Sequence, residues 1–591
     1  MFTCAATHRG LPALRQSLRP IARGVSIRHS SSGAARMGKS RNFALKIAVP
    51  TIVAAGAATI ATQYDLPFGL KEAYAEAAPV HAEPEFEKPV KRKGKSKEES
   101  RDLISSQHLQ VKQSWEHPGV YAWGSNKGKV AAPDSDEAVI KNPRRIPYFD
   151  GVLLRDIKLD PNFGAAVNEQ GDLLQWGIDY STETVAPTKT LRGKRLVSIT
   201  LSRDRIICLS ISGAVYSVPV SKDAQEKGRK PSERSWIPFW SSASPISYRV
   251  LSPKNLNWGE RIVSLSGGLE HVLLLTSKGR VFSAAAGSED FPSRGQLGIP
   301  GLTWNTRPIG SYDQCHELTA LRGFDIKQVA SGDYHSIVQD KDGRVFTFGD
   351  NSVGQLGLEY NPEAPFVDSP ALLPIQSLYQ GTGQVPKVTS IAAGGVNSFF
   401  TIDATGVALP QSEEGASSAL LGRVTADTWS CGQGLWGSLG TGRWIHIQDN
   451  LVKIKALSGL FEYDETTNKV VPIRLSHLSV GATHVAAVLN NVTHLTATES
   501  TSTDDTNWGS DLLLWGANEF FQLGTGKRNN ISAPTYIHPL YPASEKAEGR
   551  DKEHRLQLTP WKTIKINNRK VKVEQRVECG RNITAIYTAV G

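Results

Sequence analysis

The sequence predicts an all-β fold, a seven-bladed β-propeller, and three observations support this prediction. The first is a repeated unit, clearest at 266–298 and 331–357, in which a histidine is followed eight residues later by a glycine. The second is the segment after that glycine, an alternating apolar strand that leads to the turn Gly-Gln-Leu-Gly. The third is the order of strands at the two ends of the body. Self-similar units along one chain indicate a repeat architecture rather than several unrelated domains.

The eight-residue offset defines the first strand of each unit. It recurs at Phe163 and Gly171, Arg205 and Gly213, His271 and Gly279, His335 and Gly343, and Ser398 and Gly406. In the sixth unit His484 leads to an Asn490-Asn491 turn, and the seventh unit, 579–591, holds one strand. We therefore expect Phe163, Arg205, Ser398 and Ile583 to occupy the histidine position of their units.

The units also contain second strands, of which the first, 120–124, comes before all of these turns. The seven second strands are 120–124, 173–177, 215–218, 281–284, 345–349, 428–432 and 512–516. Two short alternating strands joined by Gly or Asn predict a hairpin. A lone hairpin cannot bury its apolar face, whereas sheets stacked around an axis can. Because a second strand opens the body at Val120 and a first strand closes it at Ile583, we expect these two segments to pair and to remove the exposed edges.

These motifs resemble the regulator-of-chromosome-condensation repeat, whose hallmarks are a G-x-x-H strand, a G-x-V-[FY]-x-W-G strand and a G-Q-L-G turn. The resemblance runs from about Gly119 to Gly591. The turn becomes LWGSLGTG at 435–442 and FQLGTG at 521–526. The resemblance implies a seven-bladed propeller over 116–591 that acts by binding partners rather than by catalysis.

The N-terminal region has the composition of a targeting segment. Residues 1–64 are rich in Arg and Ser, and the first acidic residue is Asp65, which predicts a mitochondrial transit peptide over 1–40, with a disordered basic tail as the alternative. The sequence GAARMGKS at 33–40 matches the phosphate-binding loop pattern, but the polar residues before it form no core strand. We therefore assign no nucleotide to Lys39.

An apolar segment and a charged segment come next. Residues 43–64 carry no charge from Ile47 to Thr62, and we interpret them as a single inner-membrane helix; a late part of the presequence or an interfacial helix are the alternatives. Basic residues before this segment favour an N-terminus in the matrix, while the basic run 88–97 favours the opposite orientation. Residues 65–115 are predicted to be a linker.

The side chains that carry chemistry form no recognisable catalytic or metal site. The five cysteines are far apart and contain no C-x-x-C pair, so the spacing predicts neither a disulfide framework nor a zinc site. His271, His335 and His484 hold the same place in different units, which predicts a structural role rather than metal binding. The sequence thus predicts no enzyme, no cofactor, no metal and no small-molecule substrate.

The candidate partner contacts lie in long insertions, because loops gather on the faces of a propeller. We expect insertions at about 219–258, 407–427, 441–478, 492–510 and 527–577. The first holds Trp236, Phe239 and Trp240, aromatic residues of the kind that anchor partners, unless they fold back onto the propeller. The last holds a basic patch for ribosomal RNA or anionic lipid, with a solvated hairpin face as the alternative. The patch consists of Lys562, Lys565, Arg569, Lys570 and Lys572.

Presequence, apolar segment and repeats together resemble the fungal mitochondrial members of this family. That resemblance implies an inner-membrane assembly factor for a respiratory complex, complex III in particular, whose partners are complex III subunits or other assembly factors. Two alternatives stay open. One is a guanine nucleotide exchange factor for a mitochondrial small GTPase, which rests on fold analogy. The other is a factor for mitochondrial ribosome biogenesis that binds ribosomal RNA or proteins.

Overall fold

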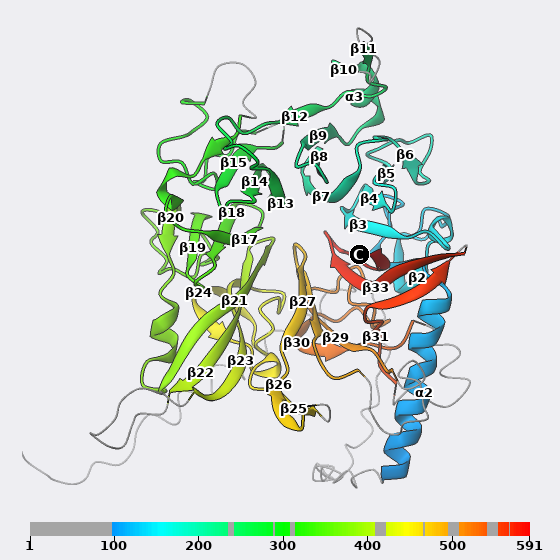
Figure 1. Ribbon diagram of the computed structural model, residues 1–591, viewed down its shortest axis with the longest axis vertical. Coiled ribbons are helices and arrows are strands. Elements are labelled where there is room, and N and C mark those ends of the chain that lie inside the picture. The colour runs from blue at the N-terminus through cyan, green and yellow to red at the C-terminus, as the bar shows by residue number, and fades with distance from the viewer. Residues whose placement is uncertain are drawn as a thin grey trace, which may run out of the picture. The chain divides into compact units, whose positions relative to one another are not determined.

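The computed structural model describes residues 97–234, 241–287, 290–307, 314–407, 421–464, 467–493, 507–540, 554–566 and 568–591. In this part of the chain, short antiparallel sheets follow one another around a ring (Figure 1). The predicted transit peptide 1–40, with its phosphate-loop pattern, and the apolar segment 43–64 lie outside the described residues. Among the residues that are described, no helix is long and apolar enough to cross a membrane.

Five sheets of the ring stand separately. The first consists of β7 (Leu196–Ser202), β8 (Arg205–Ser210), β9 (Val215–Pro219) and β12 (Arg249–Leu251). The second consists of β13 (Ile262–Gly267), β14 (His271–Thr276), β15 (Val281–Ala285) and β16 (His316–Glu317). The third consists of β17 (Ile326–Ser331), β18 (His335–Asp340), β19 (Val345–Asp350) and β20 (Phe366–Leu372). The fourth consists of β21 (Gln384–Gly394), β22 (Asn397–Val407), β23 (Leu421–Gly434) and β24 (Ile445–Lys453). The fifth contains β27 (Leu475–Val480), β28 (His484–Leu489), β29 (Ser510–Gly516), β30 (Ile531–Tyr536) and the short β31 (Gln557–Leu558).

A nine-stranded sheet contains the remaining strands of the ring. These are β1 (Val120–Ser125), β2 (Val139–Arg145), β3 (Leu154–Leu159), β4 (Gly164–Asn168), β5 (Leu173–Trp176), β6 (Thr188–Lys189), β32 (Lys562–Ile566), β33 (Arg569–Cys579) and β34 (Ile583–Val590). Its two halves are joined by one parallel residue pair, Leu154 with Ala589. The described chain therefore shows five separate blades rather than the predicted seven, because two predicted units share hydrogen bonds in this sheet.

The predicted pairing of the two chain segments is confirmed. Strand β34 pairs antiparallel with β1 from Val120 opposite Tyr587 to Gly124 opposite Ile583. Side chains from both segments, including Trp123 and Ile583, are fully buried in one apolar cluster. The edge of the first strand is thereby covered by the last strand, as ring closure requires.

Each separate sheet adds an inner and an outer strand to the predicted hairpin, and the fifth sheet also contains β31. An inner strand precedes the histidine strand, and an outer strand follows the second strand. The predicted insertions were consequently too wide: 219–258 contains β12, 441–478 contains β24 and the start of β27, and 527–577 contains β30 and most of β33. These strands lack the glycine-ended apolar pattern because one of their faces lines the channel or meets solvent. Strand β27, for example, has a single buried residue.

The predicted linker 65–115 is wrong over its last third, where α2 (Lys97–Glu116) forms a helix of 20 residues. Val111 and Trp115 lie one turn apart on the same helical face, and both are buried. The side chain of Gln107 donates from Nε2 to the carbonyl of Arg555 at 2.7 Å. Of the polar side chains described on this helix, Lys112 and Glu116 face solvent, whereas Gln107 and Ser114 are buried with Val111 and Trp115.

The remaining elements lie in the connections of the ring. They are α3 (Lys222–Lys227), the hairpin β10 (Ser232–Arg234) with β11 (Ser241–Ala243), the hairpin β25 (Phe461–Asp464) with β26 (Lys469–Pro472), and four short 3-10 helices, Pro147–Phe149, Thr319–Leu321, Ile375–Tyr379 and Lys455–Leu457.

Neighbouring units approach each other closely where the inner strands end. A Cβ atom on any of five glycines there would lie 2.1–2.6 Å from a backbone carbonyl oxygen of the next unit, a distance that real Cβ atoms do not adopt. The five are Gly268, Gly332, Gly394, Gly481 and Gly580. The first glycine of the G-x-x-H motif thus serves close packing between units.

We predict that Gly332→Ala lowers the free energy of unfolding by about 2 kcal/mol or more, because the new methyl group would collide with the Gly395 carbonyl and the His335 ring. Gly406→Ala is the matched control, since its Cβ would meet nothing closer than 3.7 Å. Urea denaturation of both variants checks this. Equal stability of the two would contradict the close-packing role of Gly332.

Candidate functional site

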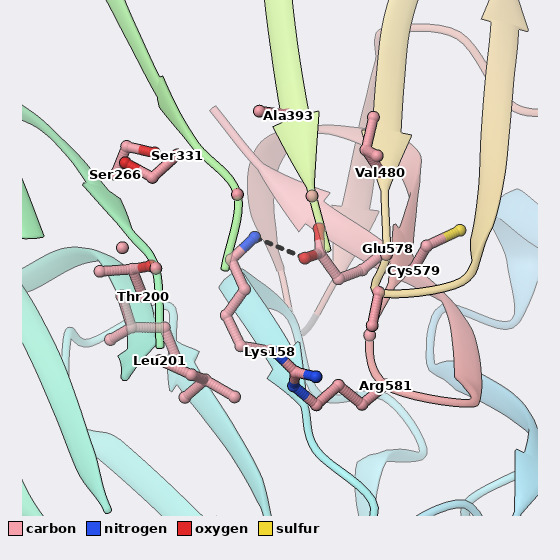
Figure 2. Close-up of a pocket in the computed structure, with 18 of the residues that line it drawn as sticks. Lys158, Thr200, Leu201, Ser266, Ser331, Ala393, Val480, Glu578, Cys579 and Arg581 are labelled. Carbon is pink, nitrogen blue, oxygen red and sulfur yellow. Dashed lines mark hydrogen bonds and ion pairs between the residues drawn. The ribbon is translucent and has the colours of Figure 1, made fainter. Parts of the chain in front are cut away.

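The inner strands surround a polar channel. A cavity of about 390 Å³ lies where β3, β7, β13, β17, β21, β27 and β33 end, and its lining includes the turns that follow them. Figure 2 shows Lys158, Glu578 and Arg581 among the side chains at this cavity. Small residues such as Ser266, Ser331 and Ala393 supply much of the remaining wall. Their small side chains leave the channel open where the units converge.

Charged side chains at this end of the channel form salt bridges that join one turn to another. Arg581, after β33, forms a salt bridge with Asp333, after β17, and its Nε lies 3.9 Å from Asp160. Arg203 bridges to Glu270 at 3.0 Å. Burial raises the pKa of Asp160 to about 6, although Arg581 opposes the shift. Burial also raises the pKa of Asp333 against the effect of Arg581. These groups hold turns together across the ring.

A half-buried ion pair also lines the channel. Lys158 Nζ contacts Glu578 at 2.7 Å, drawn as a dashed line in Figure 2, and Asp156 at 3.7 Å. Burial alone would lower the pKa of Lys158, but the two carboxylates outweigh it and raise the pKa. For Glu578, burial is the larger effect and raises the pKa. The pair joins β3 to β33, the inner strands of the two halves of the nine-stranded sheet.

The three histidines of the repeat connect each unit to the next. His335 Nε2 contacts the Ser398 hydroxyl at 2.9 Å, and that hydroxyl donates to the Gln355 carbonyl at 2.5 Å. His271 contacts Ser336 at 2.9 Å, and Ser336 donates to the Gln296 carbonyl at 2.9 Å. Since each hydroxyl hydrogen goes to a carbonyl, Nε2 of the histidine must be the donor to the hydroxyl. We call each such chain of bonds a histidine relay.

The third histidine relay lies at the ring closure. His484 Nε2 contacts Thr584 Oγ1 at 2.7 Å, and Thr584 donates to the Gln522 carbonyl at 2.6 Å. The same carbonyl accepts from Trp123 Nε1 at 2.8 Å. Strands β34 and β1 are therefore both attached to the Gly-Gln-Leu-Gly-like turn of the preceding unit.

The residue after the histidine position decides whether a relay forms. Ser336, Ser398 and Thr584 hold this following position, and each receives the histidine of the preceding unit. One unit has Asn397 at the histidine position, and the unit after it has Val485, which carries no hydroxyl, at the following position. Asn397 Nδ2 donates instead to Ser438 of its own unit, at 3.0 Å. A unit with a histidine is thus followed by a unit with Ser or Thr directly after its own histidine position. This correlation between neighbouring units can be recognised in the sequence.

Asn397 corrects one predicted position. It pairs with Gly432 as His335 pairs with Gly349, so the histidine position of this unit is Asn397 and not Ser398. The eight-residue offset fails because β22 extends to Val407, past the place where the shorter strands turn. Ser398 instead has the role of a hydroxyl that receives His335.

Burial keeps the relay histidines neutral. It lowers the pKa of His335 to about 4, and the pKa values of His271 and His484 to about 3. Their Nδ1 atoms have no hydrogen-bond partner in the described part of the chain. Within the described residues there is also no group of three or more His, Cys, Asp or Glu that could hold a metal ion.

The repeat cysteines are buried as free thiols. Cys208, Cys431 and Cys579 lie in the apolar interior, and burial raises the pKa of each thiol. A raised pKa disfavours the reactive thiolate, so these residues act as small core side chains.

The predicted partner contacts have different outcomes. Trp236, Phe239 and Trp240 lie outside the described residues. In the basic patch, Arg569 forms a salt bridge with Glu169 at 2.6 Å, and Lys562 Nζ lies 4.0 Å from the centre of the Trp115 ring. Lys565, Lys570 and Lys572 are exposed on the β32–β33 hairpin. The structure thus places Lys562 and Arg569 against other elements and leaves Lys565, Lys570 and Lys572 without a salt bridge among the described residues.

A second cavity of about 550 Å³ lies beside this hairpin, lined by the starts of β3, β7 and β27 and by Trp561. Arg576 at its wall is paired with Glu574 at 2.6 Å. Sequence reasoning missed Trp561, which is 39% exposed; its place directly before Lys562 in the basic segment was the available signal.

Comparison with known proteins identifies the class. Residues 326–355 and 342–400 match two family models of the regulator of chromosome condensation (RCC1) repeat. The ring is therefore a β-propeller in which residues 326–400 match the RCC1 repeat.

Individual relatives extend the likeness over most of the propeller. The chain is 26% identical over 499 residues to Protein FMP25, mitochondrial, of Saccharomyces cerevisiae, which covers 80% of this chain and 73% of the relative. It is 26% identical to the ultraviolet-B receptor UVR8 of Arabidopsis thaliana over 45% of this chain and 56% of the receptor. The crystal structure of human WBSCR16 matches with a TM-score of 0.50 at 18% identity, covering 80% of this chain and 98% of that one, which supports the fold alone.

We predict that His335 and Ser398 are energetically coupled. A double-mutant cycle of His335→Ala and Ser398→Ala, followed by urea denaturation, should give a coupling free energy of about 1 kcal/mol or more, because the two side chains share one buried relay. The control cycle combines Ser398→Ala with His484→Ala, which belong to different relays and should couple by less than about 0.5 kcal/mol. Equal coupling in both cycles would contradict the relay.

We also predict that acid destabilises the ring through these histidines. Unfolding restores their ordinary pKa of about 6.5, so below that pH the unfolded chain binds more protons than the folded chain. The free energy of unfolding should therefore fall as pH drops from about 6.5 towards about 4, by up to about 1.4 kcal/mol per pH unit for each histidine.

Urea denaturation across this pH range checks the effect, with His335→Gln as the variant. Its free energy of unfolding should depend less steeply on pH than that of the wild type, because one titrating group is gone. Parallel curves for the two proteins would show that His335 is not held neutral in the fold.

Proposed function

We propose that this protein is a mitochondrial propeller of the inner membrane that binds proteins without catalysing a reaction and assists the assembly of a respiratory complex, most specifically complex III. The observation that carries the proposal is the likeness to FMP25, a mitochondrial protein, over 80% of the chain. The acid-free, Arg- and Ser-rich segment before Asp65 supports the same compartment independently.

The absence of catalysis is supported by how the reactive side chains are used. The repeat histidines are neutral relay members, the repeat cysteines are buried thiols, and the channel charges bridge turns. These groups serve the fold of the described chain. Partner binding is then left to exposed loops and hairpins on the two faces of the ring, where propellers present their variable segments.

We further propose that the ring counts seven quasi-equivalent units. The inner strands β33, β3, β7, β13, β17, β21 and β27 succeed one another around the channel, and all seven line the same cavity. On this interpretation the nine-stranded sheet consists of two blades that share the single residue pair Leu154–Ala589.

Complex III is chosen because the combination of presequence, apolar segment and repeats resembles the fungal mitochondrial members of the family. We predict that mitochondria lacking this protein lose complex III while mitochondrial translation continues. Blue-native electrophoresis of the respiratory complexes, with translation products labelled in parallel, tests this.

Each other outcome of that experiment has a meaning. Normal respiratory complexes would remove the assembly proposal. A general loss of mitochondrial translation would favour ribosome biogenesis, the third interpretation of the sequence. Normal complexes together with accelerated nucleotide release from a mitochondrial GTPase by the purified protein would favour an exchange factor.

A further inference from the structure

The β32–β33 hairpin extends beyond its blade as a two-stranded ribbon. Strand β33 pairs with β34 only from Val573 onward, opposite Val590. The preceding residues of β33 pair with β32, with Lys565 opposite Lys570 and Thr563 opposite Lys572. Residues 569–572 therefore have one neighbouring strand instead of two. In Figure 1 the hairpin belongs to the red C-terminal segment, next to α2.

The register of this ribbon sorts its basic residues by face. Side chains alternate along a strand, and cross-strand partners share a face. Lys565, Lys570 and Lys572 consequently lie on one face, where all three are exposed. Lys562 and Arg569 lie on the other face, where they contact Trp115 and Glu169. We call the first group, together with the adjacent Trp561, the lysine face.

The charges of the lysine face are not neutralised within the described structure. No salt bridge to Lys565, Lys570 or Lys572 occurs among the described residues, and the nearby Glu574 is paired with Arg576 at 2.6 Å. Like charges directly opposite each other, as Lys565 and Lys570 are, destabilise an antiparallel pair. Binding of an anionic partner would neutralise these charges and would account for an otherwise unfavourable cluster of lysines.

The geometry of Trp561 favours a membrane surface over single-stranded nucleic acid. Lys572 Nζ and Arg576 Cζ lie over its ring, 5.0 and 5.7 Å from the ring centre, so a base that stacked on that side of the ring would have to displace two cations. The ring is 39% exposed beside the lysines. A Trp with one end wet and one end apolar is typical of the lipid–water interface.

The type of cation indicates the same partner. All three charges that lack a salt bridge among the described residues are lysines, which are flexible point charges, whereas phosphates of nucleic acids are more often held by the bidentate fork of arginine. Lysine clusters bind diffuse anionic surfaces such as phospholipid headgroups, with each lysine adding to the affinity.

We propose that the lysine face docks onto an anionic phospholipid surface and orients the propeller against the membrane. This inference rests on the proposed inner-membrane location, and it supplies a second attachment beside the weakly apolar segment 43–64. Stable membrane attachment commonly needs two such signals.

Vesicle flotation tests the inference. The protein purified from mitochondria is mixed with vesicles of phosphatidylcholine alone or of phosphatidylcholine with phosphatidylglycerol, at low and at high ionic strength. The wild type should bind the anionic vesicles more strongly than the neutral ones, and the difference should shrink as salt screens the charges. The triple variant Lys565→Gln, Lys570→Gln, Lys572→Gln should lose on the order of 100-fold in partitioning onto anionic vesicles at low salt.

The matched control removes the same charge elsewhere, with Lys227→Gln, Lys341→Gln and Lys527→Gln, three exposed lysines outside the hairpin. It should bind like the wild type. The triple variant should also melt no earlier than the wild type, because the Lys565–Lys570 repulsion is gone. This melting measurement separates loss of binding from loss of fold.

Two results would overturn the inference. One is equal binding of the triple variant and the wild type to anionic vesicles. The other is salt-sensitive binding of single-stranded RNA that the triple variant loses while its vesicle binding is unchanged, which would identify a nucleic-acid surface. Neither result depends on the state of complex III, so the proposed assembly function would stand or fall separately.

Discussion

The pairing of β34 with β1 is the constraint on which the rest of the structure depends, because it turns a row of sheets into a ring. At this seam Gln522 offers its backbone carbonyl to both partners, accepting from Thr584 on β34 at 2.6 Å and from Trp123 on β1 at 2.8 Å. His484 adds its bond to Thr584 from the preceding unit. The seam therefore uses the same histidine relay that joins units within the chain. Without it, the inner strands would not converge, and the channel, its ion pairs and the β32–β33 hairpin would lose their positions.

The ring divides the side chains into two groups with different roles. Groups that often catalyse reactions are used by the fold. The histidines and channel carboxylates are held between units by bonds such as His335–Ser398 and Lys158–Glu578, and the repeat thiols are buried in the apolar interior. Their pKa values follow from burial and make proton transfer near neutral pH unfavourable for the histidines. The lysine face has the opposite character, since its charges are exposed and lack salt bridges among the described residues. A scaffold of this kind acts through its surface, which is the physical basis for assigning a binding function.

Sequence reasoning predicted the elements whose pattern repeats and missed those whose pattern does not. The histidine strands, the second strands and their closure at Ile583 and Val120 could be predicted because buried alternating strands and glycine turns leave a strong signal. Inner strands such as β27 could not, because residues facing the channel are small or polar. The histidine position of one unit was predicted at Ser398, one residue too late, because β22 is longer than its counterparts. For the site, composition identified the basic patch, but only the register of Lys565 opposite Lys570 separates its exposed lysines from Lys562 and Arg569.

Hydrogen exchange of the backbone amides tests the central claim, that the ring is closed by bonds as strong as those within it. In native conditions, the amides of β34 and β1 should exchange as slowly as those of β18 and β19, because opening the seam would break a histidine relay and the shared carbonyl of Gln522 together. If β34 and β1 instead exchange much faster than β18 and β19, the seam opens on its own. The protein would then be a row of sheets with a loose end, which contradicts a ring closed by its histidine relay.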